Sequence, residues 1–138
     1  MRRAEAMSEE NVEIVRRSFE AFARGDFESA FAAHAPDTAW CTAADEPDCQ
    51  TYRGLGGLRR LVASLDELWE GRFDGLMEFE DFIDRGDWVV VPWRARMHGR
   101  MSGIDVDVEE TYAVRVRTGR IVRVEEFRST AEALEAVT

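Results

Sequence analysis

Four residues that can transfer protons or bind an oxygen atom occur at alternate positions near the carboxyl end of the chain. Glu110 and Tyr112 lie in one run, and Glu126 and Arg128 lie in the next. In both runs valines occupy the same parity, which indicates that these polar side chains share the inward faces of two strands. A carboxylate that faces a core is costly unless it has a partner or lines a cavity. The sequence therefore predicts a pocket with polar groups in its wall.

An acid–base site is one interpretation of these residues. Glu126 or Glu110 would move a proton on a substrate, and Tyr112, Arg128 or His34 would stabilise the substrate oxygen. Structural roles are the alternative. Glu126 and Arg128 can form an ion pair at the rim of the pocket, and Glu110 can be satisfied within a hydrogen-bonded network. Tyr112 can be a packing residue of which only the hydroxyl meets water.

His34 is expected on the buried stripe of a helix, because Phe27, Ala30, Phe31 and His34 follow helical spacing. Near the carboxyl end of that helix its charged form would be favoured. A satisfied core or rim histidine is the alternative interpretation. The apolar wall of the pocket is expected to include the following residues: Phe19, Phe31, Trp40, Trp69, Trp93, Met97, Val108 and Val124.

The elements that must position these residues change in period halfway along the chain. Apolar residues of the first half recur at helical spacing, which predicts helices over 11–24, 27–34 and 58–69. The second half alternates with a period of two, which predicts strands over 77–83, 88–101, 104–117 and 120–128. A final short helix begins after Ser129, where Ser129 and Glu132 match a capping box.

These elements predict one α+β domain over residues 8–138. Its curved, mixed or antiparallel sheet wraps around the N-terminal helices and forms a cone with an internal cavity. Residues 1–7 are expected to form a loose extension, because Ser8 is a good helix cap. In the strand 104–117, alternation predicts one buried set and one solvent-facing set. The buried set is Val106, Val108, Val114 and Val116, and the set expected to face solvent or a partner is Asp105, Asp107 and Arg115.

Composition narrows the classes of partner. The 138 residues include 28 acidic and 18 basic ones, for a net charge of −10, which argues against nucleic acid and anionic membranes as partners. No apolar run is long enough to span a membrane, and the amino terminus lacks the apolar segment of a secretion signal, so a cytoplasmic protein is expected. Cys41 and Cys49 are then expected to be free thiols. A metal site from Cys41, Cys49, His34 and Asp48 matches no ligand spacing, so neither metal nor cofactor is expected.

An ordered set of short motifs runs through most of the chain. They are Gly25-Asp26, Trp40, Tyr52-Arg53-Gly54, Gly86-Asp87, Ser102-Gly103, Gly119-Arg120-Ile121 and Phe127. With them, the chain from about Ser8 to its end resembles the SnoaL-like branch of the nuclear transport factor two-like superfamily. The resemblance implies an α+β cone with a largely apolar cavity, and a homodimer formed through the sheet. It does not imply one activity, since the superfamily includes polyketide cyclases, ketosteroid isomerases, epoxide hydrolases, dehydratases and members that only bind.

Two activities of that superfamily lack their residues in this chain. Ser18 stands where the resemblance would place the isomerase phenol, and Thr42 stands where it would place the general-base aspartate. The epoxide hydrolase pattern needs two aspartates bridged by an arginine, but only Glu126 matches one of them, and Arg94 and Arg96 have outward parity.

SnoaL-like cyclases fit the overall pattern best. They use a cavity carboxylate as acid or base without metal or cofactor, and their aspartate corresponds most nearly to Glu126. Two hypotheses remain open at this point. The chain is a cofactor-free enzyme for a small, mostly apolar carbonyl or polyketide-like substrate, of cyclase, isomerase or dehydratase type. Alternatively, it is a non-catalytic domain whose cavity binds a small apolar ligand.

Overall fold

The computed structural model describes residues 2–43, 50–70 and 77–138. Within these residues it contains four helices and one eight-stranded sheet. In chain order the elements are α1 (Arg2–Ala23), α2 (Phe27–Ala32), β1 (His34–Cys41), β2 (Thr51–Arg53), α3 (Gly54–Leu68), β3 (Trp69–Glu70), β4 (Met77–Phe79), β5 (Ile83–Arg85), β6 (Trp88–Gly99), β7 (Asp105–Arg117), β8 (Arg120–Phe127) and α4 (Thr130–Ala136).

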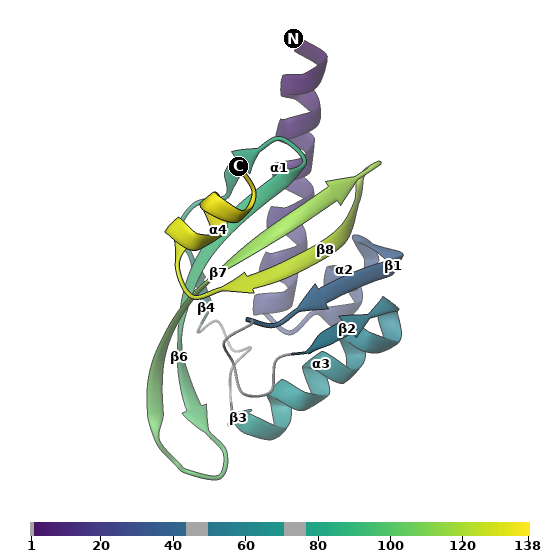
Figure 1. Cartoon of the computed structure of the whole chain (residues 1–138). Coiled ribbons are helices and arrows are strands. Elements are labelled where there is room, and N and C mark those ends of the chain that lie inside the picture. Colours follow the sequence, from purple (N-terminus) through teal and green to yellow (C-terminus); the bar gives the residue numbers. More distant parts are fainter. Residues whose placement is uncertain (1, 44–49, 71–76) are drawn as a thin grey trace.

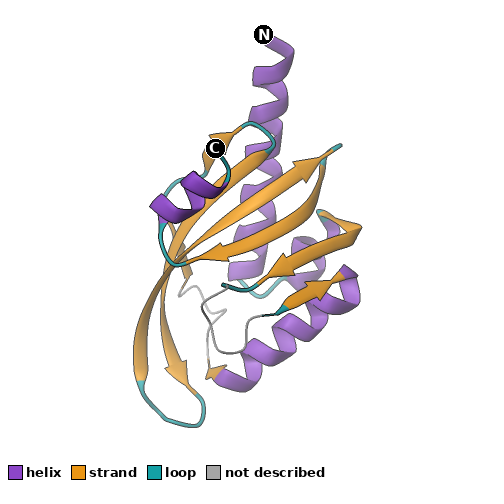
Figure 2. Cartoon of the chain, in the orientation of Figure 1, coloured by secondary structure: helices purple, strands orange, loops and turns teal. Residues whose placement is uncertain are grey.

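The sheet is mixed and strongly curved. Its strand order is β2-β1-β8-β7-β6-β3, and both β4 and β5 pair with β6. Strands β1 and β8 run parallel, while the other pairs are antiparallel. Helix α1 crosses one face of the sheet, and α3 lies along β1 and β2 (Figure 1). Helices and strands thus enclose a cone, which confirms the predicted α+β architecture (Figure 2).

Helix α1 supplies much of the core on the concave face. Val15, Phe19 and Phe22 recur on one side of the helix and are almost completely buried. Each such side chain contributes on the order of 2 kcal/mol through the apolar area it removes from water. The helix ends at Ala23, and the positive φ of 80° at Gly25 allows the amides of Gly25 and Asp26 to bond back to the carbonyls of Phe22 and Ala21. This close turn brings α2 back against α1.

The first helix begins earlier than the sequence analysis predicts. The structure places residues 2–7 within α1, where a loose extension was expected, and Ser8 lies inside the helix instead of capping it. Alanine, glutamate, methionine and arginine, which fill residues 2–7, all have high helix propensity, so the helix continues through them.

The second helix is shorter than predicted, and His34 belongs to a strand. Helix α2 ends at Ala32, and His34 pairs with Ile121 of β8. The amide of Ile121 also donates to the carbonyl of Ala33 at 2.9 Å. Pro36 disfavours helical conformation at Ala35, so the helix ends before it and the chain pairs with β8 instead. The expectation of a histidine at a helix carboxyl end is wrong.

The predicted strand 77–83 is divided into β4 and β5 by Pro92 of β6. The Pro92 carbonyl accepts a hydrogen bond from the Glu80 amide at 3.3 Å, so this edge of Pro92 faces the β4–β5 segment. The amide and carbonyl of a strand residue point to the same side, and proline has no N–H to donate there. The three residues between Phe79 and Ile83 consequently lie opposite only two residues of β6, Val91 and Pro92.

The alternation predicted for β7 holds only in part. Val114 and Val116 are buried and Val108 is half-buried, but Val106 is 39% exposed. Val106 lies opposite Met97 in the β6–β7 hairpin, which extends past the helices (Figure 1). None of the helices in the described part of the chain covers that end of the strand, so Val106 stays exposed although it lies on the predicted inward face.

The other face of β7 and β8 also departs from expectation at one end. Asp105 and Asp107 are exposed as predicted, whereas Arg115 is half-buried. A bulge at this point pairs Val116 with Ile121, so Ile121 takes the buried place and Val122 is only half-buried.

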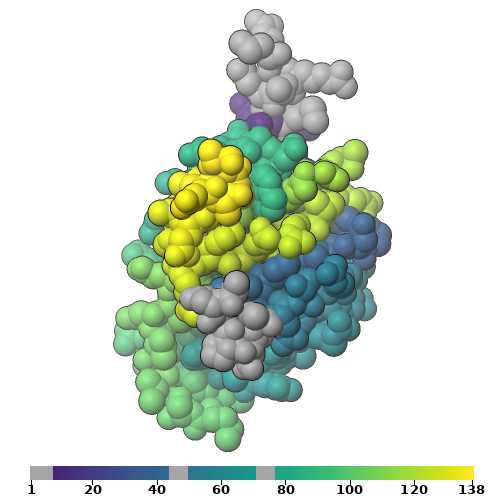
Figure 3. Space-filling view, in the orientation of Figure 1, coloured from purple at the N-terminus to yellow at the C-terminus, as the bar shows by residue number. Residues whose placement is uncertain are grey.

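Helix α4 covers the middle of the convex face. Ser129 caps it by accepting from the Glu132 amide at 3.2 Å, as the capping box predicts. The hydroxyls of Thr130 and buried Thr111 lie 3.0 Å apart, which fixes the helix to β7. The space-filling view shows this helix resting on the sheet (Figure 3). Among the described residues, no helix is long and apolar enough to cross a membrane.

Candidate functional site

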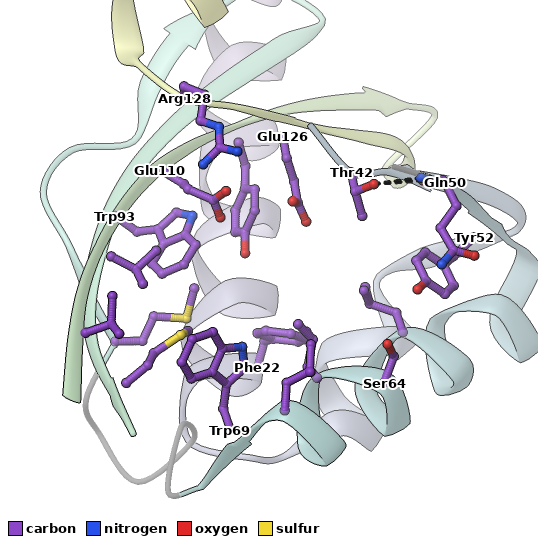
Figure 4. Close-up of a pocket in the computed structure, with 18 residues that line it drawn as sticks. Phe22, Thr42, Gln50, Tyr52, Ser64, Trp69, Trp93, Glu110, Glu126 and Arg128 are labelled. Atoms are coloured by element: carbon purple, nitrogen blue, oxygen red, sulfur yellow. Dashed lines mark hydrogen bonds between the residues drawn. The ribbon is translucent and has the colours of Figure 1, made fainter. Parts of the chain in front are cut away.

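A cavity of about 450 Å³ lies between the concave face of the sheet and helices α1 and α3. Its polar end is formed by Glu110 and Tyr112 of β7, Glu126 of β8 and Arg128 directly after β8. Figure 4 shows the wall around it. The other lining residues are Phe22, Thr42, Gln50, Tyr52, Leu61, Ser64, Leu65, Leu68, Trp69, Met77, Trp93, Met97, Val106 and Val108. Exposed Leu68 and Val106 lie where the cavity meets solvent.

Glu126 is oriented by a tryptophan that is 86 positions away in the sequence. The Trp40 indole N–H donates to Glu126 Oε2 at 2.7 Å. Trp40 is only 2% exposed and faces Glu126 because β1 runs parallel to β8, with Trp40 paired to Val124. Hydrogen bonds to a charged acceptor at this distance are among the stronger ones in proteins. The carboxylate therefore has a fixed direction, toward the cavity (Figure 4).

Tyr112 lies in the centre of an aromatic cluster. Its ring centroid is 5.2 Å from those of Phe19 and Trp40 and 5.4 Å from that of Trp93. In the register of the sheet it is directly opposite Glu126. Ring packing holds the phenol at the wall of the cavity.

Glu110 and Arg128 complete the polar end. They point toward one another in Figure 4. Glu110 is directly opposite Trp93 in the register of β6 and β7. Trp93 is 4% exposed, and its buried indole N–H has no hydrogen-bond partner among the described residues. An unmade buried donor costs about 1–3 kcal/mol, so this position is one that a hydrogen-bond acceptor would stabilise.

The opposite wall carries polar groups from β2, from α3 and from the residues that directly follow β1 and precede β2. The backbone N–H of Gln50 donates to the Thr42 hydroxyl at 2.8 Å, and the backbone N–H of Thr42 donates to the backbone carbonyl of Gln50 at 3.0 Å. Tyr52 and Ser64 lie near this pair and face the cavity (Figure 4). The cavity is thus apolar in its middle, with polar groups on two sides.

His34 does not line this cavity. It is 4% exposed, its Nδ1 lies 3.0 Å from the Thr38 hydroxyl, and its ring stacks on Trp40 with a centroid distance of 6.5 Å. Burial lowers the pKa of His34 to about 4, because the charged imidazolium would lose its hydration. The expectation that its charged form is favoured is therefore wrong. The structure places His34 in the core beneath Trp40.

This lowered pKa predicts a specific pH dependence of stability. The unfolded chain, with an ordinary histidine pKa near 6.5, binds more protons than the folded chain between pH 6.5 and pH 4. Stability from His34 is therefore full above the unfolded pKa and is lost as the pH falls toward the folded pKa. Between pH 7 and pH 5 we expect a loss of about 2 kcal/mol in the free energy of unfolding. His34→Gln should remove this component in urea denaturation, and His98→Gln, at a half-buried histidine 2.7 Å from Asp105, should retain it. Equal pH dependence of all three proteins would contradict the assignment.

The eight apolar residues expected in the wall fall into two sets. Trp69, Trp93, Met97 and Val108 line the cavity. Phe19, Trp40 and Val124 are buried beneath its surface, and half-buried Phe31 packs against the same core. Sequence reasoning did not name the lining residues of α3, although the apolar stripe of Leu61, Leu65 and Leu68 carries a helical signal. Thr42 and Gln50 have no such signal, because their segment has no periodicity.

The cysteines and acidic residues form no recognisable metal centre in the described part of the chain. No group of three or more histidine, cysteine, aspartate or glutamate side chains converges there. Cys41 is half-buried, and its sulfur accepts a contact from the Thr51 hydroxyl at 3.7 Å. Asp48 and Cys49 lie outside the described residues.

Comparison with known proteins gives matches over most of the chain. A model of the SnoaL-like domain matches residues 15–124. The uncharacterised protein Rv0034 of Mycobacterium tuberculosis is 30% identical over 128 residues, which cover 91% of this chain and 94% of that protein. An NTF2-like protein from Burkholderia thailandensis has a similar structure, with a TM-score of 0.77 and 27% identity over 93% of this chain and 97% of that one. TerC, co-crystallised with polyporic acid, has a TM-score of 0.72 and 22% identity over 93% and 98% of the two chains.

Proposed function

Because the chain belongs to the SnoaL-like domain family, we propose that its cavity binds a small, mostly apolar carbonyl compound and catalyses proton transfer on it without a cofactor. Glu126 is the proposed proton-transfer group. The observation that carries this proposal is the 2.7 Å hydrogen bond from the Trp40 indole to a carboxylate in the wall of an apolar cavity.

The nature of this partner supports acid–base chemistry. An indole N–H only donates, so Trp40 orients the Glu126 carboxylate without offering a site that could take its proton. A general base must be held within hydrogen-bond reach of the proton it removes, and rigid placement in the core supplies that condition. Trp40 packs against Phe19 and Phe22 as well as Tyr112, so it cannot move freely.

Nearby donors would stabilise the substrate oxygen as it gains negative charge. Tyr112, opposite Glu126 in the sheet, can donate through its hydroxyl, and Arg128 adds positive charge at the same end of the cavity. The proposal therefore assigns proton transfer to Glu126 and oxygen binding to Tyr112 and Arg128. Glu110, which faces Arg128, positions that guanidinium (Figure 4).

The walls suggest the size and polarity of the substrate. A volume of about 450 Å³ suits a compound of two or three fused rings, and Trp69, Trp93 and Phe22 present apolar surface to it. Binding of polyporic acid by TerC, a protein of similar fold, is consistent with a small-molecule cavity in this architecture.

The test uses 2-tetralone as a probe, a bicyclic ketone that carries exchangeable protons beside its carbonyl. We expect the protein to accelerate the incorporation of deuterium from D₂O at the carbons next to the carbonyl, as measured by mass spectrometry. Ser64→Phe, which fills the cavity from α3, should abolish the acceleration. Ala63→Phe is the matched control, because the neighbouring residue is exposed and lines no part of the cavity.

Two results would overturn the proposed function. Acceleration that survives in Ser64→Phe would place the chemistry outside the cavity. Saturable quenching of tryptophan fluorescence by 2-tetralone without any deuterium incorporation would instead favour a domain that only binds its ligand.

A further inference from the structure

A second hollow, of about 410 Å³, lies on the convex face of the sheet and shares no residue with the cavity. It is formed where the β7–β8 hairpin lies beside the start of β1 (Figure 3). Four of its eight lining residues are arginines, in a chain with a net charge of −10. The lining residues are Ala35, Asp37, Arg115, Arg117, Thr118, Arg120, Val122 and Arg123.

The four arginines oppose one another across the two strands. Arg115 is directly opposite Arg123, and Arg117 is directly opposite Arg120. Side chains in such positions are about 5 Å apart at Cβ, and like charges placed this way destabilise a sheet. Two successive unfavourable pairs therefore occur at one place on an otherwise acidic protein.

Acidic side chains of the described residues neutralise little of this charge. Arg123 has a carboxylate partner, Glu125, at 3.1 Å. Arg115 lies over the Trp88 ring at 5.8 Å, and no described residue accepts a hydrogen bond from its buried Nε. Within the described residues, Arg117 and Arg120 form no ion pair. Asp37 is the one carboxylate among the eight lining residues.

The backbone beneath the arginines is also held in an unfavourable conformation. Thr118, which lines the hollow, has a φ of +47°, a region that β-branched residues rarely occupy. A bulge between Arg115 and Val116 lies on the same hairpin and bends the strands locally. The two-residue turn Thr118-Gly119 needs positive φ at both positions, and it places Arg117 and Arg120 side by side.

We propose that this hollow binds a small phosphate-bearing molecule. A dianion would offset the repulsion in both arginine pairs. Guanidinium groups bind phosphate through paired N–H donors, which suits a site in which four of the eight lining residues are arginines. The volume admits a phosphate ester as well as a free phosphate ion.

Inorganic phosphate and pyrophosphate are the probes, titrated into the full chain by calorimetry at constant ionic strength. We expect saturable binding, tighter for pyrophosphate, because it can reach more of the four guanidinium groups. Arg117→Gln combined with Arg120→Gln should weaken pyrophosphate binding at least 10-fold without unfolding the chain, since both side chains are exposed. Arg59→Gln combined with Arg60→Gln, at exposed positions of α3, makes the same change in net charge and should bind as the wild type does.

Three outcomes would overturn this proposal. The first is that neither anion binds saturably to the wild type. The second is that both double variants weaken binding equally, which would indicate a general effect of net charge. The third is that Arg117→Gln with Arg120→Gln changes the oligomeric state in light scattering while phosphate and pyrophosphate fail to bind. The arginines would then contact a second copy of the chain.

Discussion

Glu126→Gln is expected to lower the rate of deuterium incorporation into 2-tetralone at least 100-fold while the chain stays folded. General acid–base groups contribute roughly 100- to 10,000-fold, and an amide cannot serve as the base. The Gln side chain has the same shape, and its carbonyl oxygen can still accept from the Trp40 indole, which now donates to Glu126 Oε2. We therefore expect a loss of stability of only about 1 kcal/mol, the difference between a charged and a neutral acceptor.

Glu125→Gln is the matched control for this experiment. Glu125 is the neighbouring residue on β8, lines no part of the cavity and pairs with Arg123 at 3.1 Å. Its exchange rate should equal that of the wild type. If Glu126→Gln retains exchange, Glu126 is not the proton-transfer group. A large drop in melting temperature would instead support the alternative in which Glu126 mainly stabilises the fold.

Residue periodicity was sufficient to predict the architecture, because every large element buries one face. Val15, Phe19 and Phe22 follow helical spacing in α1, and Val114 and Val116 follow strand spacing in β7. Where pairing with another strand decides the conformation, local pattern misleads. His34 fits a helical stripe, yet it joins β1 because β8 lies beside it.

The candidate site was accessible to sequence reasoning only where it lies on adjacent strands. Glu110 and Tyr112 share parity on β7, as do Glu126 and the valine two positions before it on β8, and two hairpin-linked strands must pair. The structure brings these side chains to one cavity. No local signal connects Trp40 with Glu126, because their contact depends on the parallel pairing of β1 with β8.

Trp40→Phe and Trp93→Phe form a matched pair that tests the energetic role of the Glu126 hydrogen bond. Both tryptophans are nearly buried, at 2% and 4% exposure, and both contact Tyr112. At each position the substitution replaces the indole by a phenyl ring and removes the indole N–H. Only the partner differs, since the Trp40 N–H donates to Glu126 and the Trp93 N–H has none.

Trp40→Phe is therefore expected to be the more destabilising variant by about 3 kcal/mol in the free energy of unfolding. A hydrogen bond to a charged group contributes about 1.5–3 kcal/mol, whereas removing an unmade buried donor recovers part of the roughly 1–3 kcal/mol that it costs. Urea denaturation followed by far-ultraviolet circular dichroism gives both values without depending on tryptophan emission.

Coupling between Trp40 and Glu126 separates this hydrogen bond from the loss of ring volume. In a double-mutant cycle, the extra cost of Trp40→Phe should shrink when Glu126 is already glutamine, because the charged acceptor is gone. Trp93→Phe should have the same effect in both backgrounds. Equal losses from the two tryptophan substitutions, with no coupling to Glu126, would show that ring packing alone places this carboxylate and would remove the main support for its fixed orientation.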